Sequence, residues 1–242
     1  MSISSVSSSS LPEGLLSALR EFSATILNPY DLQEFLDRLL RSVLAITKAD
    51  GAGVMLSGRN GLGFASATDQ DVVDAEVTQD RVREGACHEA YQINQPIVVD
   101  DLRDTGRWQE YRERTLRLGF LAVLGMPLNA AGQTIGVLDV YRRSAGPWTA
   151  ADREAAEVLA TIAAGYILHA NQLRAQHELA EQLQQALESR DLIGQAKGLL
   201  MARHRIDAEE AFQLLRKTSQ DTNLKLRDVA AKLVVSEADS TG

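Results

Sequence analysis

The sequence predicts an α+β domain with an antiparallel sheet, then a long helical or coiled-coil connector, and a C-terminal all-α bundle of three helices. Three observations lead to this prediction. All five prolines lie within the first 147 of the 242 residues, and proline is strongly disfavoured inside helices. Short apolar runs of strand length lie in the same part of the chain, whereas apolar residues recur with helical spacing after it. A mixed region is therefore expected up to Pro147, and an all-helical region after it.

The predicted boundaries divide the chain into five segments. Residues 1–12 and 237–242 are expected to be disordered tails. Residues 13–170 are expected to form the α+β domain, including two N-terminal helices. The coiled-coil connector is expected over residues 171–188, and the three-helix bundle over residues 189–236.

The α+β domain is predicted to begin with two amphipathic helices, separated by Asn28–Pro29. Five apolar runs of strand length follow, and a polar helical stretch over Asp71–Tyr91 separates the second run from the third. Residues 129–132 predict a hairpin turn, so the last two strands are expected to be antiparallel. The five expected strands are Gly53–Leu56, Phe64–Ala67, Ile97–Val99, Phe120–Pro127 and Thr134–Tyr141.

The proline-free part is predicted to start with one long helix that reaches Arg203. Thr149 is a suitable N-cap, and Asp152 three residues later can complete a capping box. Apolar residues recur every seven positions, which is the pattern of a coiled coil. The first half of this pattern fits packing against the sheet domain, and the part from Leu173 to Leu187 predicts a homodimer. The repeat consists of Leu159, Tyr166, Leu173, Ala180 and Leu187.

Two shorter helices are predicted to complete the bundle. Asp207 and Glu210 have the spacing of a capping box, which indicates the start of the second helix. A break is expected at Asp221–Asn223, and apolar residues from Leu226 onward predict the third helix.

Composition limits the class of protein. The single cysteine, Cys87, excludes an intramolecular disulfide framework and a zinc site of several cysteines. No apolar run reaches the roughly 18 to 20 residues of a membrane span. The serine-rich stretch Met1–Ser10 lacks the basic residues and apolar core of a signal peptide. A cytoplasmic location without membrane contact is therefore expected.

Charge is distributed unevenly along the chain. The formal net charge is −8, yet Arg190–Lys232 contains nine Lys or Arg against six Asp or Glu. An acidic body with a mildly basic C-terminal part favours a negatively charged partner for that part. The alternative is a chance local excess of basic residues.

The first helix of the bundle is predicted to expose two glycines. Projection at 100° per residue places Gly194 and Gly198 opposite the apolar face. Glycine destabilises a helix by about 1 kcal/mol relative to alanine, so two on one exposed face need a reason. The absence of Cβ lets a nucleic-acid backbone approach closely, and the alternative is close packing against another helix. This glycine stripe consists of Arg190, Gly194, Lys197, Gly198 and Met201.

Three residue pairs in the sheet domain are candidate sites. Cys87–His88 can bind haem, a metal or a tetrapyrrole, but a metal site needs three or four convergent ligands and no local set supplies them. Asp100–Asp101 are adjacent on an extended segment and point to opposite sides, which argues against an acid/base pair. Arg107–Trp108 fit either a loop contact or a ligand contact. The sequence also lacks a nucleophile–base set, a phosphate loop and zinc-ligand spacing, so no catalytic residue, metal or cofactor is expected.

The C-terminal segment resembles an ANTAR domain in three blocks that keep their order and spacing. Residues 190–201 read RDLIGQAKGLLM, residues 211–216 read AFQLLR, and residues 223–230 read NLKLRDVA. The resemblance implies RNA binding and transcription antitermination, through a two-hairpin RNA that displaces a terminator. The RNA-binding residues that it implies are Arg190, Gln195, Lys197, Gly198, Met201, Arg203, Arg216, Asn223 and Lys225.

The upstream domain resembles a GAF domain over about Asp31–Ala170. The resemblance implies a six-stranded antiparallel sheet flanked by helices, and a small-molecule pocket lined from Asp71–Leu118. The matching blocks are Gly85–Ala90, Pro96–Leu102, Arg107–Trp108, Gly125–Leu128, Ile135–Tyr141 and Trp148–Asp152.

Together these resemblances predict a GAF–ANTAR regulator that responds to a signal. It is expected to be a homodimer through the helix around Leu173–Leu187, and to bind paired RNA hairpins near terminators. The competing hypothesis is a signalling regulator that acts on a protein partner, with a ligand-sensing GAF domain and no direct RNA contact.

Overall fold

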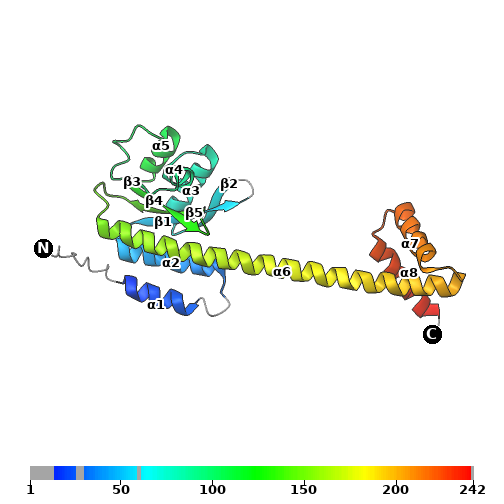
Figure 1. The fold of residues 1–242 in the computed structure, drawn as a ribbon. Helices are drawn as coiled ribbons and strands as arrows, with labels where there is room; N and C mark the ends of the chain where they lie inside the picture. The colour runs from blue at the N-terminus through cyan, green and yellow to red at the C-terminus, as the bar shows by residue number, and fades with distance from the viewer. Residues whose placement is uncertain (1–13, 26–29, 59–60, 241–242) are drawn as a thin grey trace, which may run out of the picture. The chain divides into compact units, whose positions relative to one another are not determined.

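The computed structural model describes residues 14–25, 30–58 and 61–240. The chain divides into two compact units, residues 1–171 and 172–242, each described by itself (Figure 1). The predicted N-terminal tail, residues 1–12, lies outside the described residues.

A five-stranded antiparallel sheet forms the centre of the first unit, with the strand order β2-β1-β5-β4-β3. The α+β prediction is confirmed, but the described residues form five strands where the resemblance implied six. A two-residue turn at Ala131 and Gly132, both with positive φ, connects β4 to β5 and suits the twist of a hairpin. The elements of this unit are α1 (Leu15–Thr25), α2 (Leu32–Thr47), β1 (Gly51–Gly58), β2 (Gly61–Ala67), α3 (Gln70–Val82), α4 (Ala86–Ile93), β3 (Ile97–Val99), α5 (Gln109–Arg117), β4 (Ala122–Ala130), β5 (Gln133–Arg142) and the first part of α6 (Ala150–His204).

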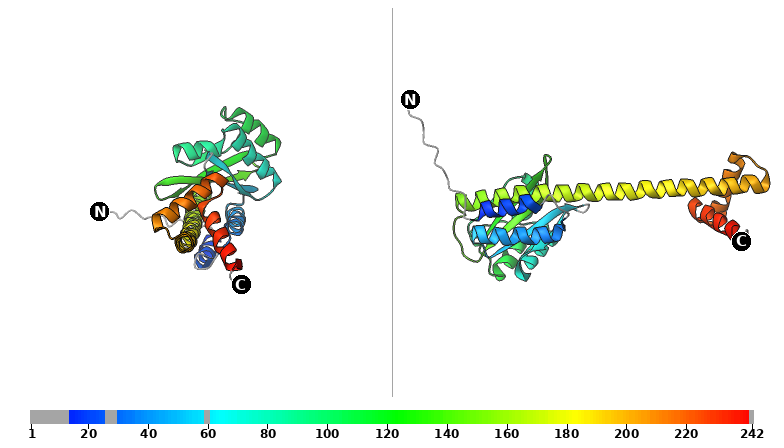
Figure 2. Two further views of the ribbon diagram at one scale, coloured as in Figure 1. Left: turned by 90° about the vertical axis from the view of Figure 1, so that its right-hand side faces the viewer. Right: turned by 90° about the horizontal axis from the view of Figure 1, so that it is seen from below.

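Helices cover both faces of the sheet (Figure 2). α1, α2 and α6 pack on one face, where Leu138 and Val140 of β5 join an apolar core. α3, α4 and α5 pack on the other face, where Val137 and Tyr141 of β5 join a second core. Successive side chains of a strand point to opposite faces, so the central strand β5 contributes to both cores.

The polar stretch predicted as one helix over Asp71–Tyr91 is two helices. Arg83 and Gly85 both have positive φ, of 58° and 133°, and the chain turns between α3 and α4 there. A Cβ at Gly85 would lie 2.2 Å from Oε1 of Gln79, so both the backbone conformation and the available space require glycine. The helical periodicity of the stretch did not reveal this break.

Helix α5 was not predicted from the sequence. Its nine residues are mostly charged, and only Tyr111 and Thr115 are buried. A helix with so narrow an apolar face has no clear periodic signal.

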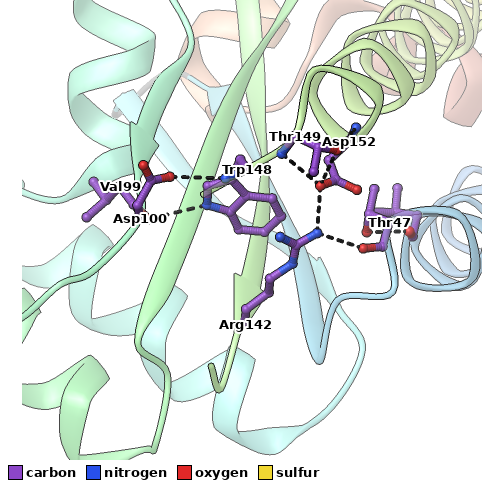
Figure 3. Close-up of polar contacts among 8 residues, drawn as sticks. Thr47, Val99, Asp100, Arg142, Trp148, Thr149 and Asp152 are labelled. Atoms are coloured by element: carbon purple, nitrogen blue, oxygen red, sulfur yellow. Dashed lines mark hydrogen bonds and ion pairs between the residues drawn. The ribbon is translucent and has the colours of Figure 1, made fainter. Parts of the chain in front are cut away.

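The start of α6 is held by a capping box and an ion pair (Figure 3). Thr149 and Asp152 exchange backbone and side-chain hydrogen bonds of 3.0 and 3.1 Å, as predicted. Nη2 of Arg142 lies 2.9 Å from Oδ2 of Asp152 and donates to the backbone oxygen of Thr47. The guanidinium also lies 4.0 Å above the ring of Trp148. These contacts join the end of β5, the end of α2 and the first turn of α6.

The second unit contains the rest of α6, then α7 (Ala208–Thr222) and α8 (Leu226–Ser240). The capping box of Asp207 and Glu210 is present, and Asn223 ends α7 in the left-handed conformation. Helix α8 continues past the predicted end of the bundle at residue 236, because no proline or glycine follows before Gly242. The three helices share a core of Ala196, Leu200, Ala211, Leu215, Val229 and Ala230.

Among the described helices, none combines the length with the apolar character that crossing a bilayer requires.

We expect Asp152→Asn to lower the free energy of unfolding by about 2 kcal/mol at pH 7, since it removes a hydrogen-bonded charge beside Arg142. Burial raises the pKa of Asp152, but hydrogen bonds from Thr149 and Arg142 lower it more, to below its ordinary 3.8. A carboxyl group whose pKa is lowered in the folded state stabilises the fold at pH values above its ordinary pKa. This stabilisation is lost as the pH falls through the folded-state pKa. The difference between parent and variant should therefore shrink below about pH 4.

Urea unfolding monitored by circular dichroism at several pH values measures this effect. The control is Glu154→Gln, which neutralises an exposed carboxylate in the same helix and should change stability by less than about 0.5 kcal/mol. A constant difference between Asp152→Asn and the parent from pH 7 to pH 3 would contradict the ion-pair assignment.

Candidate functional site

The glycine stripe lies on the solvent side of the last turns of α6. Ala196 and Leu200 of the same helix face the bundle core, and Arg190, Gly194, Gly198 and Met201 are exposed. The stripe is therefore on the side predicted from the periodicity.

Nothing in the described part of the chain requires glycine at the two stripe positions. A Cβ built at Gly194 or at Gly198 meets no atom within 4 Å apart from the helix's own nearby backbone. Both residues are helical and carry no positive φ among the described residues. Within the described part of this chain, no other helix packs against these glycines. The two positions form an open surface that a ligand backbone can approach.

Lys197 connects the stripe to α7. Its side chain is half-buried, and Nζ lies 5.8 Å from the ring centroid of Phe212. A cation at this distance from an aromatic face is attracted by the ring quadrupole. The contact fixes the direction of the ammonium group at the edge of the stripe.

The other residues implied by the resemblance lie around the bundle. Gln195 is exposed beside the stripe, whereas Arg203 falls on the same side of α6 as Ala196 by helical projection. Asn223 is the C-cap of α7, with φ 52°, a conformation that asparagine tolerates better than most residues. Arg216 and Lys225 are exposed on α7 and directly before α8. The structure thus groups four of the nine implied residues, Arg190, Lys197, Gly198 and Met201, on one stripe.

The pairs Asp100–Asp101 and Arg107–Trp108 of the sheet domain hold loops. Oδ1 of Asp100 accepts from the backbone N–H of Trp148 (Figure 3), and Asp101 is bound by the Arg103 side chain, which lowers the pKa of Asp101. Arg107 and Trp108 both donate to the carboxylate of Glu89, over 2.6 and 3.1 Å. The loop interpretation of Arg107–Trp108 therefore has direct support.

A surface cleft of about 400 Å³ lies between α3 and α5. Two of its three arginines have acidic partners: Arg81 contacts Glu110, and Arg114 lies 3.0 Å from Asp74, while Arg117 donates to the backbone oxygen of Glu113. The charges of this cleft are thus largely balanced within the protein.

The first unit contains a buried polar cluster between the sheet and helices α3 and α4. Nε2 of Gln79 lies 3.2 Å from Oε2 of Glu76 and 3.1 Å from the hydroxyl of Tyr141. The Tyr141 hydroxyl donates to Oε1 of Glu76 over 3.2 Å, and Oε1 of Gln79 accepts from the backbone N–H of Cys87 over 2.9 Å. All members are buried completely. The buried polar cluster consists of Glu76, Gln79, Cys87, Asp139 and Tyr141.

Burial changes the protonation of this cluster. It raises the pKa of Asp139 from 3.8 to about 7. Burial, together with the negative charge of Asp139, also raises the pKa of Glu76 well above its ordinary value. The pKa of the Cys87 thiol is raised for the same two reasons. Without a bound cation, the cluster therefore favours protonated forms of these groups.

No local sequence pattern predicts this cluster. Its members come from α3, α4 and β5, so no local spacing brings them together. One signal was present: Asp139 interrupts an otherwise apolar strand, Ile135–Tyr141, at a position whose neighbours are buried. His88, the sequence neighbour of Cys87, is not one of the cluster residues; its ring hydrogen-bonds the backbone of Gln79 and interacts with the charges of Arg83 and Asp80.

Comparison with known families identifies both parts of the chain. The family model of the GAF domain matches residues 31–167, and that of the ANTAR domain matches residues 181–234. These matches confirm both resemblances. The search of curated proteins found no match.

The first unit is similar in fold to solved GAF structures. The GAF domain of a phosphoenolpyruvate-protein phosphotransferase from Coxiella burnetii shares 16% identity with a TM-score of 0.53, covering 67% of this chain and 97% of that one. The corresponding domain from Acinetobacter has 16% identity and a TM-score of 0.52, with coverages of 66% and 97%. Free methionine-R-sulfoxide reductase from Neisseria meningitidis, solved with its substrate, has 16% identity and a TM-score of 0.53, with coverages of 66% and 91%.

We expect Gly53→Ala to destabilise the first unit by about 1 to 3 kcal/mol, because it overpacks the buried polar cluster. A Cβ at Gly53 would lie 2.5 Å from Oε1 of Glu76 and 3.0 Å from its Cδ. The matched control is Gly63→Ala in β2, where a Cβ meets nothing within 4 Å. Thermal unfolding of both variants measures the difference, and equal melting temperatures would contradict the packing described here.

Proposed function

The chain belongs to the GAF family and carries a C-terminal ANTAR domain, and on this basis we propose that it is a signal-responsive, RNA-binding transcription antiterminator. The ANTAR domain implies RNA-binding antitermination, and the GAF domain implies the sensing of a ligand. The observation that supports the RNA surface best is the open glycine stripe on α6. Two glycines that the fold does not need lie there beside Arg190 and Lys197.

We infer that RNA phosphates bind along the glycine stripe. The guanidinium of Arg190 and the ammonium of Lys197 supply positive charge, and Gly194 and Gly198 let the sugar–phosphate backbone approach the helix. Phosphate contacts release counterions, so affinity should fall as salt concentration rises.

Specificity then comes from polar side chains around the stripe. Gln195 and Asn223 can hydrogen-bond the edges of exposed loop bases, and Arg203, Arg216 and Lys225 add contacts to phosphates or bases. Phe212 is the one aromatic residue of residues 189–236, and its ring is half-buried beside Lys197. A stacking platform for single-stranded RNA is therefore absent from this surface. These features fit a folded target such as the loops of paired hairpins.

A homodimer through α6 would present two such surfaces. Every residue from 171 to 188 is exposed in the single chain, and Leu183 and Leu187 are 57% and 56% exposed. An unsupported helix with exposed leucines at heptad spacing gains stability from a partner helix. The earlier repeats differ, since Leu159 and Tyr166 pack in the core of the first unit. These observations support Leu173–Leu187 as the proposed dimer segment.

The GAF domain is proposed to sense a ligand and not to catalyse a reaction. One of the structures similar in fold is an enzyme, the reductase from Neisseria meningitidis, but at 16% identity the likeness concerns the fold alone. The only cysteine here, Cys87, is buried and its thiol pKa is raised. A buried thiol of raised pKa is a poor nucleophile.

We expect Lys197→Glu to weaken binding to a paired-hairpin RNA at least about tenfold, through repulsion between the new carboxylate and phosphates. Gel-shift titration of the full-length protein at two salt concentrations measures this, with a loop-scrambled RNA for comparison. The control is Lys232→Glu, which reverses the charge of an exposed residue on α8 and should change affinity much less. Equal affinity of parent and Lys197→Glu would reject the stripe as the RNA surface. Equal binding to both RNAs would favour the protein-partner hypothesis.

We expect Leu183→Glu to convert the dimer to monomer, because it places two charges in the apolar seam of the coiled coil. Light scattering coupled to size-exclusion chromatography gives the mass in solution. Gln182→Glu adds the same charge to the neighbouring exposed position outside the seam, and should stay dimeric. A parent that is monomeric at micromolar concentration would exclude this dimer.

A further inference from the structure

The buried polar cluster brings together three ligand atoms that the sequence keeps far apart. Glu76 comes from α3, Cys87 from α4 and Asp139 from β5. One carboxylate oxygen of each acid and Sγ of the cysteine all lie within 4.8 Å of one another. The three side chains are fully buried. Polar groups that converge inside an apolar core need hydrogen bonds or a bound ion to compensate for their lost hydration.

Gln79 lies 3.5 Å from Oδ2 of Asp139, but the hydrogen bonds of the cluster leave one carboxylate oxygen without a partner. Gln79 and Tyr141 contact both oxygens of Glu76. Oδ1 of Asp139, by contrast, has no hydrogen-bond partner in the described part of the chain. An unpartnered oxygen on a completely buried carboxyl group is costly, so its position beside two other ligand atoms indicates a bound species.

Glycines on the two strands beside β5 leave space for these carboxyl groups. Asp139 pairs with Gly53 of β1 on one side and with Gly125 of β4 on the other. A Cβ at Gly53 would lie 2.5 Å from Oε1 of Glu76, and a Cβ at Gly125 would lie 3.1 Å from Oδ1 of Asp139. A side chain at either glycine position would therefore press against a carboxylate oxygen of the cluster.

We propose that Glu76, Cys87 and Asp139 bind one divalent transition-metal ion of the class that accepts mixed sulfur and oxygen ligands, such as Zn²⁺. Thiolate sulfur selects such ions over Mg²⁺ and Ca²⁺, which prefer oxygen ligands alone. Three protein ligands also leave one position of a tetrahedral ion open, as in zinc sites that bind a further molecule. This proposal does not depend on the RNA-binding function.

Charge balance supports an ion in preference to a shared proton. A proton shared by Glu76 and Asp139 neutralises one of the two carboxylates, and the Cys87 thiol hydrogen-bonds Asp139, but the second carboxylate keeps its buried charge. A divalent ion interacts with all three groups: as the metal–sulfur and metal–oxygen bonds form, the Cys87 thiol and any protonated carboxyl group release their protons to solvent.

The neighbouring residues position these ligands. Gln79 donates to Glu76 and accepts the backbone N–H of Cys87, so one amide fixes ligands from two helices. Tyr141 donates to Glu76 from β5. Such outer contacts orient metal ligands and tune their affinity.

The test uses the untagged full-length protein, unfolded with a chelator and refolded with Co²⁺, Zn²⁺ or Mg²⁺. The refolding step gives the ion access to a buried site. We expect one Co²⁺ per chain and a thiolate-to-cobalt charge-transfer band in the near ultraviolet, displaced by Zn²⁺ and absent with Mg²⁺. Because Cys87 is the only cysteine, this band identifies it as a ligand without any variant.

Three variants complete the test, each checked for folding by circular dichroism. Cys87→Ser should abolish the band. Asp139→Asn should weaken Co²⁺ binding at least about 100-fold, since outer contacts alone contribute 10- to 100-fold. His88→Gln, next to the ligand in sequence but outside the cluster, should leave the band and the affinity unchanged. The proposal is overturned if the refolded parent takes up neither Co²⁺ nor Zn²⁺, or takes up Co²⁺ without the charge-transfer band. It is also overturned if a folded Cys87→Ser variant keeps the band.

Discussion

A carboxyl group in the middle of the central strand is the constraint around which the first unit is arranged. Asp139 points into the core between the sheet and helices α3 and α4, where an apolar residue would be expected. Glycines on both neighbouring strands leave room for it. The two helices bring polar groups toward it, and Gly85 provides the turn that lets Gln79 reach the start of α4. Burying a polar group requires such compensation, which explains why this face of the sheet combines glycines with polar side chains.

The opposite face of the sheet has a simpler construction. α1, α2 and the first part of α6 contribute phenylalanine, leucine and alanine side chains to an apolar core, and the rings of Phe35 and Tyr166 stack at 3.9 Å. The ion pair of Arg142 and Asp152 closes this layer where β5 leads into α6. One face of the domain is thus an apolar core, whereas the other contains the buried polar cluster.

Much of this architecture was predictable because its signals are local. Helical spacing, the capping boxes at Thr149 and Asp207, and the absence of proline after Pro147 indicated the helices of the C-terminal part. The glycine stripe was also predictable, since one helix places its residues by a fixed rotation. The break at Gly85 and the cluster around Asp139 were not predictable, because each depends on a contact between elements that are distant in sequence. Asn223 shows a further limit: its left-handed cap conformation gives the residue a structural role that a motif comparison does not distinguish from a binding role.

The two glycines of the stripe also affect how the end of α6 moves. Each lowers local helix stability by about 1 kcal/mol relative to alanine, and neither is compensated by packing on its exposed side. Backbone amides around them are therefore expected to open and exchange with solvent more readily than amides in an alanine-rich helix. A ligand that covers the end of α6 would also order its backbone. The loss of backbone entropy would then reduce the net binding free energy. Ligand binding to the glycine stripe is thus thermodynamically linked to the local folding of α6.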